Sequence, residues 1–135
     1  MGLNMKTVIA AILLMAFSSS FYLNKTLNGV WKYQGGIYNG KAEGEPKDYT
    51  LQRRYNASYY EAYIIENGVK PEKYEAGYYT LSTDTCLETE TYSSQPSKLI
   101  GKTVHYLYSV RNDTLTLKGR LPSGMTVTEY WKKVK

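Results

Sequence analysis

The chain has 135 residues, the usual size of a single domain. Its 42% hydrophobic content excludes a disordered chain, and 15 Tyr against 2 Phe and 2 Trp favour strands. The net charge of +5 is not concentrated in a block of like charges, so no nucleic-acid partner is expected. One Cys and one His exclude a disulfide framework and a Cys- or His-based metal site, and no motif indicates a cofactor.

The first twenty residues have the pattern of a secretory signal peptide. Lys6 precedes the apolar run 7–17, and three serines, 18–20, follow it. The run is short for a membrane span, and the alternative is a buried N-terminal helix. We expect cleavage between Ser18 and Leu23. The sequence therefore predicts a mature domain over 21–135 in the periplasm or outside the cell, without a transmembrane segment.

The rest of the chain alternates apolar and polar residues between turn signals, which is typical of strands. Asn67-Gly68 and Asn112-Asp113 are the kind of pair that forms tight hairpin turns. A glycine-rich segment, 35–46, is expected to be a loop. The eight predicted strands cover about 29–34, 48–55, 59–66, 73–82, 85–92, 102–110, 115–119 and 125–134.

The sixth predicted strand has the clearest faces. Val104, Tyr106 and Tyr108 share one side with Val110, and His105 lies on the opposite side. Eight strands joined by hairpins fit an all-β, antiparallel up-and-down barrel, because closure removes the exposed edges of a sheet. A β-sandwich is the alternative.

The segment Leu27-Asn-Gly29-Val-Trp31-Lys resembles the Gly-x-Trp opening strand of lipocalins. Four later fragments and the ending Glu129-Tyr-Trp131-Lys-Lys-Val are similar to secreted bacterial lipocalin-like domains of unassigned function. The resemblance covers about 27–135 and implies a calycin-type barrel with Trp31 and Trp131 at its floor. Lipocalins tend to place an arginine over the tryptophan, whereas the last strand here carries Lys132 and Lys133.

Few residues suggest catalysis. His105 is expected on the outer surface, although a catalytic base is the alternative, and no Gly-x-Ser-x-Gly motif is present. Glu88 and Glu90 share a strand face, and we interpret them as a solvated surface rather than an acid/base pair. We therefore expect no catalytic residues and a protein that is not an enzyme.

The tyrosines point more strongly to binding, because each offers an apolar ring and a polar hydroxyl. Glu129 shares a face with Trp131, so it either points inward, paired with Arg53, Arg54 or a tyrosine, or reaches water at the rim. Ordinary packing of strand tyrosines is the plain alternative. The residues that we expect to bind a ligand are Tyr79, Tyr106, Tyr108, Glu129 and Arg53, with Tyr49, Tyr55 and Tyr60 as further lining candidates.

Three functions remain open. The leading hypothesis is a small apolar or amphipathic ligand inside the barrel. A carbohydrate- or surface-binding module using exposed tyrosines, and a structural or partner-binding barrel with a filled interior, are the alternatives. An interior void of about 300 Å³ or more would favour the first. The sequence does not predict the oligomeric state.

Overall fold

The computed structural model describes residues 26–135, so the predicted signal peptide lies outside the described residues. Within these residues, nine strands form one antiparallel sheet in the order β2-β1-β3-β4-β5-β6-β7-β8-β9. Their bounds are β1 Gly29–Tyr38, β2 Lys41–Gly44, β3 Thr50–Tyr55, β4 Tyr59–Ile65, β5 Glu72–Leu81, β6 Thr85–Ser93, β7 Thr103–Arg111, β8 Thr114–Arg120 and β9 Thr126–Lys133.

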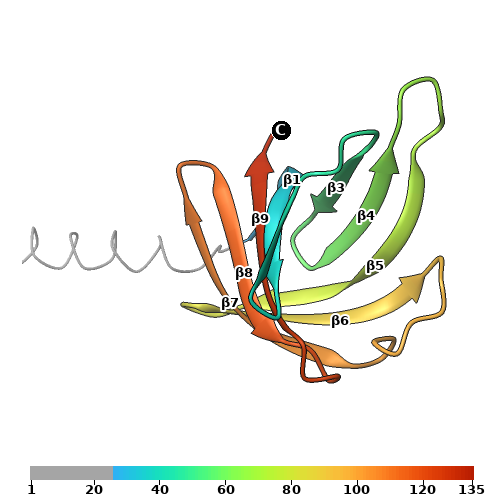
Figure 1. Ribbon diagram of the computed structural model, residues 1–135. Helices are drawn as coiled ribbons and strands as arrows, with labels where there is room; N and C mark the ends of the chain where they lie inside the picture. Colours follow the sequence, from blue (N-terminus) through green and yellow to red (C-terminus); the bar gives the residue numbers. More distant parts are fainter. Residues whose placement is uncertain (1–25) are drawn as a thin grey trace, which may run out of the picture.

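The sheet closes into a barrel because β1 also pairs with β9, from Trp31 opposite Lys133 to Tyr38 opposite Val127. Figure 1 shows the strands curving around one interior. The barrel has eight strands, and β2 is an extra one. The predicted all-β barrel is confirmed, and the architecture is consistent with a calycin-like fold.

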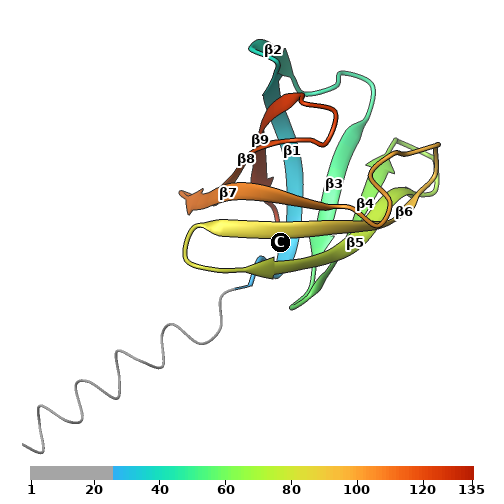
Figure 2. The same ribbon diagram turned by 90° about the horizontal axis from the view of Figure 1, so that it is seen from below.

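The glycine-rich segment differs from its predicted loop. Asn39 and Gly40 both have positive φ, of 50° and 81°, and make a tight turn between β1 and β2. β1 therefore pairs with β3 through its first half and with β2 through its second half. Figure 2 shows β2 beyond the barrel rim, near the β8–β9 connection. The Asn39 amide donates a hydrogen bond to the carbonyl of Thr126, the first residue of β9.

One end of the barrel is closed by turns and aromatic side chains. The Trp31 indole N–H donates to the Leu27 carbonyl at 2.8 Å, and the Tyr79 hydroxyl donates to the Asn56 carbonyl. Lys133 Nζ lies 5.6 Å from the centre of the Trp31 ring. A lysine of the last strand thus lies over the Trp31 ring, within the range of cation–π attraction.

Clean alternation gives the expected faces. Val104 and Tyr106 on β7 and Leu115 and Leu117 on β8 are buried in one core, whereas His105 is exposed. Within the described residues, three β-bulges break the alternation on other strands. In β1, Gln34 is the extra residue opposite β9. In β5, Tyr74 is the extra residue opposite β4, and in β6, Thr91 is the extra residue opposite β5.

Candidate functional site

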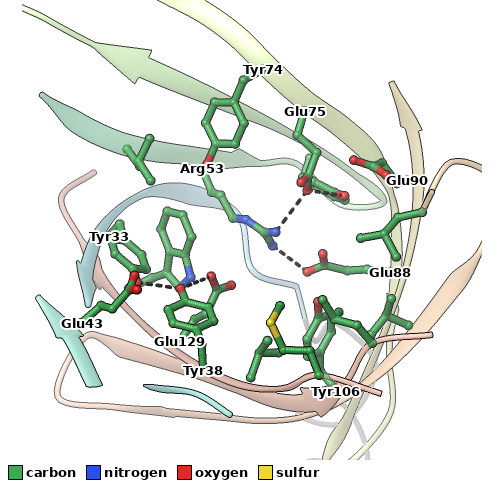
Figure 3. Close-up of a pocket in the computed structure, with 18 of the residues that line it drawn as sticks. Tyr33, Tyr38, Glu43, Arg53, Tyr74, Glu75, Glu88, Glu90, Tyr106 and Glu129 are labelled. Atoms are coloured by element: carbon green, nitrogen blue, oxygen red, sulfur yellow. Dashed lines mark hydrogen bonds and ion pairs between the residues drawn. The ribbon is translucent and has the colours of Figure 1, made fainter. Parts of the chain in front are cut away.

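The end of the barrel opposite Trp31 holds a cavity of about 370 Å³. Exposed residues, including Glu43 and Lys102, stand at its mouth, and buried residues of several strands form its inner wall. Among the aromatic side chains that line it are Tyr33, Tyr38, Tyr49, Tyr60, Tyr74, Tyr106 and Trp131. Figure 3 shows that polar side chains also reach this cavity, from strands on different sides of the barrel.

Arg53 is the centre of the first polar cluster. Its Nη1 donates to Glu88 Oε2 at 2.7 Å and to the Tyr55 hydroxyl at 2.7 Å, and its Nη2 donates to Glu75 Oε2 at 3.3 Å. Tyr60 donates its hydroxyl to the same Glu75 oxygen at 2.8 Å. The cluster thus joins β3, β4, β5 and β6 through side chains (Figure 3).

Aromatic rings surround the guanidinium of Arg53. Its Cζ lies 4.8 Å from the Tyr60 ring centre and 5.2 Å from that of Trp131, within the range of cation–π attraction. Burial alone would lower the pKa of Arg53, but Glu88, Tyr55, Glu75 and Tyr60 together outweigh burial and raise this pKa well above its ordinary value. Burial raises the pKa of Glu88, and Arg53 opposes that shift.

A second polar cluster lies around Glu129. The Tyr38 hydroxyl donates to Glu129 Oε2 at 2.8 Å and lies 2.6 Å from the Tyr33 hydroxyl. The bulge at Gln34 makes this possible, because it turns Tyr38 to the same interior as Tyr33. A Cβ at Gly36 would come 2.8 Å from the Tyr38 hydroxyl, so the glycine leaves room for this ring. Burial and the Glu129 charge together raise the pKa of Tyr38.

Glu90 completes the acidic lining. Its Oε2 accepts a hydrogen bond from Ser97 at 2.6 Å, within the connection between β6 and β7. The Gly101 amide donates to the Glu90 carbonyl at 2.8 Å and holds this connection against β6. Burial raises the pKa of Glu90, whereas the Ser97 hydroxyl lowers it.

Two buried donors lack an acceptor among residues 26–135: Arg53 Nε and the indole Nε1 of Trp131. Buried polar groups are nearly always paired in folded proteins, and an unpaired one costs about 1–3 kcal/mol. Both residues line the cavity.

The structure brings three of the predicted binding residues to the cavity. Arg53, Tyr106 and Glu129 line it together with Trp131. Glu129 points inward and pairs with a tyrosine hydroxyl, which is one of the two predicted arrangements.

The two remaining predicted residues lie elsewhere. Tyr79 lies at the closed end, where its hydroxyl accepts a hydrogen bond from the Leu27 amide and donates one to the Asn56 carbonyl. Tyr108 donates a hydrogen bond from its hydroxyl to the Ser82 carbonyl at 2.9 Å. Neither lines the cavity. Both follow the apolar alternation of their strands, but alternation places a residue on a face without giving its height along the barrel.

Glu88 and Glu90 correct a further expectation. Their interpretation as a solvated surface was wrong, because they are only 4% and 7% exposed and line the cavity. Spacing by two residues shows that both share a face, but it does not show whether that face is buried. Cys86 on the same face could have indicated burial, since a lone cysteine is most often buried. Tyr33, Tyr38, Tyr74 and Glu75 also went unpredicted.

Comparison with known proteins adds no relative. No protein-family model matches this chain, and no curated protein matches it.

Within residues 26–135, no helix is long and apolar enough to cross a membrane. The same residues contain no group of three or more His, Cys, Asp or Glu that could hold a metal ion.

Proposed function

We propose that this protein is a non-enzymatic, exported lipocalin-like barrel that binds a small amphipathic molecule in its open-ended cavity. The observation that carries the proposal is a cavity of about 370 Å³ lined by aromatic rings and a few convergent polar groups. Ligand pockets usually have a volume of about 300–1,000 Å³ and this mixture of lining residues. A barrel used only as a structural element would be expected to fill this space with side chains.

The polar groups give the ligand a preferred orientation. The apolar body would contact rings such as Tyr60, Tyr74 and Tyr106, and its polar group would reach the carboxylates deeper in the wall. His105, the one imidazole of the chain, is exposed on the outer face. It therefore does not act as a base on a bound molecule, which supports binding over catalysis.

The outer tyrosines are a weaker site. Tyr59 and Tyr78 are neighbours on β4 and β5, with ring centres 5.3 Å apart and ring planes at 66° to one another. Sugars stack on flat, exposed ring faces, and an edge-to-face pair offers a smaller flat area. Carbohydrate binding is thus the less favoured alternative.

Titration with the neutral fluorescent probe N-phenyl-1-naphthylamine tests the proposal. We expect saturable binding to the wild type. Tyr74→Ala should weaken this binding by about tenfold or more, because a ring in contact with a ligand contributes at least about 1.4 kcal/mol. Tyr78→Ala is the matched control on the same strand, since Tyr78 is 57% exposed on the outside. Tyr108→Ala is a second control, because Tyr108 does not line the cavity.

The controls also separate the alternatives. Each variant is checked by circular dichroism, so that a loss of binding is not a loss of folding. Sensitivity to Tyr78→Ala but not to Tyr74→Ala, in a polysaccharide pull-down, would favour the carbohydrate alternative. If the wild type binds no neutral probe, the interior is not a ligand site and a structural or partner-binding role replaces it.

Export is part of the same proposal and has its own test. Expression with the native N-terminus should give a periplasmic or extracellular product that begins between Ser19 and Asn24. Mass spectrometry of the mature chain measures this directly. A cytoplasmic product that retains Met1 would contradict export without touching the binding proposal.

A further inference from the structure

The cavity has more negative than positive charge among its inner lining residues. Arg53 is the one cation of the inner wall in the described chain, whereas four carboxylates line the same wall: Glu75, Glu88, Glu90 and Glu129. Arg53 pairs with Glu88 and Glu75, which leaves that cluster with one excess negative charge when both are ionised. At the mouth, Glu43 and Lys102 balance one another.

Within residues 26–135, the other two carboxylates have only hydroxyl partners. Glu90 accepts from Ser97 and Glu129 accepts from Tyr38, and a hydroxyl donor leaves the carboxylate charge in place. We propose that the molecule bound in this cavity is an organic cation, namely a protonated amine carried on a small apolar body. The inference rests on the proposed function and specifies the chemical class of its ligand.

Glu88 provides a second observation. The residue is only 4% exposed, and both hydrogen bonds to its carboxylate, from Arg53 and Tyr55, are to Oε2. Its Oε1 accepts none of the hydrogen bonds found within residues 26–135. Figure 3 shows the Glu88 carboxylate aimed into the cavity from β6. An acceptor that is not already paired can receive the N–H groups of an ammonium in the cavity.

The rings around the cavity favour a cation too. The face of an aromatic ring carries partial negative charge and attracts ammonium groups. Tyr60 and Trp131 already hold the Arg53 guanidinium in this way. Burial and the charge of Glu88 raise the pKa of Tyr106, so this hydroxyl stays protonated beside the carboxylates.

An anionic ligand such as a fatty acid fits this lining poorly. Both terminal nitrogens of Arg53 are taken, Nη1 by Glu88 and Tyr55 and Nη2 by Glu75. A ligand carboxylate would therefore approach several like charges, and the buried donors left unpaired within residues 26–135 are one N–H of Arg53, at Nε, and the Trp131 indole N–H. A metal ion is also disfavoured, since the carboxylates of the described residues are not grouped as metal ligands.

Three probes with one apolar body test the proposal: 4-phenylbutylamine, 4-phenylbutanol and 4-phenylbutyrate, which are a cation, a neutral molecule and an anion at pH 7. Each is titrated directly by calorimetry against the wild type at fixed ionic strength. We expect the amine to bind at least about tenfold more tightly than the alcohol, and the carboxylate to bind most weakly.

Charge-neutral variants locate the effect. Glu129→Gln and Glu75→Gln keep the size of each side chain and an acceptor oxygen, so each should lower the preference for the amine over the alcohol by about fivefold or more. Glu61→Gln is the matched control, because Glu61 pairs with Lys73 on the outside of the barrel at 3.3 Å. This control should keep the full amine preference.

The outcomes separate the two proposals. If the wild type binds the neutral probes and the alcohol as tightly as the amine, the cation inference is overturned and the binding function stands. If the carboxylate binds most tightly, the inference is likewise overturned. If no probe binds, the binding function and the inference both fail.

Discussion

Arg53 Nη1 and Glu88 Oε2 lie 2.7 Å apart inside the barrel, and both residues are buried. They come from β3 and β6, which are separated in the sheet by β4 and β5. The ion pair therefore ties together strands that share no backbone hydrogen bonds. Because neither charge is solvated, each side chain depends on the other for compensation.

Removing Arg53 alone should destabilise the barrel strongly. Arg53→Met leaves the buried Glu88 carboxylate without its cation, and we expect a loss of about 3–5 kcal/mol in the free energy of unfolding. The double variant Arg53→Met/Glu88→Leu should recover much of this loss, because it removes both buried charges. Urea unfolding of the wild type, both single variants and the double variant measures the coupling. Additive losses would show that the two charges act independently.

The sequence predicts the barrel well where strands alternate without interruption. The faces of β7 and β8 follow directly from their apolar residues, because no β-bulge interrupts the pairing of these two strands. Tyr38 was missed because segment 35–46 was expected to be a loop. Alternation from Tyr33 would also have put Tyr38 outside, since the bulge at Gln34 depends on pairing with β9, about ninety residues away. Local alternation contains no information about such a shift.

The polar cluster was only partly predictable for the same reason. Arg53 and Glu129 were identified as possible partners in the interior, but they belong to two separate clusters. The true partner of Arg53 is Glu88, 35 residues away in the chain. The residues on either side of Glu88 are Leu87 and Thr89, so the sequence of β6 does not indicate whether Glu88 points into the barrel or to the outside. Closure of the sheet, which depends on the whole chain, decides which face is buried.

The two sides of the barrel wall should respond very differently to truncation. Trp31 is 2% exposed at the closed end, so Trp31→Ala should cost about 3–5 kcal/mol, the range for loss of a buried aromatic ring. His105→Ala should change stability by no more than about 0.5 kcal/mol, as is typical of exposed positions. Denaturant unfolding curves check both values, and similar losses would contradict the face assignment of β7.

Cys86 should be unreactive in the folded protein. It is fully buried, and burial raises the pKa of its thiol to about 12, so very little thiolate is present at pH 8. We expect no reaction with Ellman's reagent in buffer and release of one thiol equivalent per chain in urea, since the chain has one cysteine. Rapid reaction of the native protein would mean that the wall opens at β6.

Gly77 should not tolerate a side chain. A Cβ at this position would collide with the Thr89 carbonyl oxygen and come 2.9 Å from the Tyr60 ring. Gly77→Ala is therefore expected to cost about 1–3 kcal/mol, as overpacking does. Gly44→Ala on β2 is the matched control, because its Cβ would meet no atom within 4 Å, and it should change stability by less than about 0.5 kcal/mol. Equal effects of the two variants would contradict the tight packing at Gly77.

The acidic cavity should make the barrel less stable as the pH rises from acid toward neutral. Burial raises the folded-state pKa of Glu90 and of Glu88 above the ordinary value of 4.5. The folded state then binds protons that the unfolded state has already released. The free energy of unfolding therefore falls as the pH rises from about 4.5 through the folded-state pKa, and it stays lower above that point.

Two variants at one hydrogen bond test the sign. Glu90→Gln removes the titrating group, so the loss of stability between pH 4.5 and 7 should be smaller than in the wild type. Ser97→Ala should enlarge it, because the Ser97 hydroxyl stabilises the charged carboxylate and lowers the pKa of Glu90. Thermal melts at half-unit pH steps would measure all three profiles. A wild-type profile that rises toward neutral pH, or Ser97→Ala and Glu90→Gln profiles that shift in the same direction, would show that burial does not dominate at Glu90.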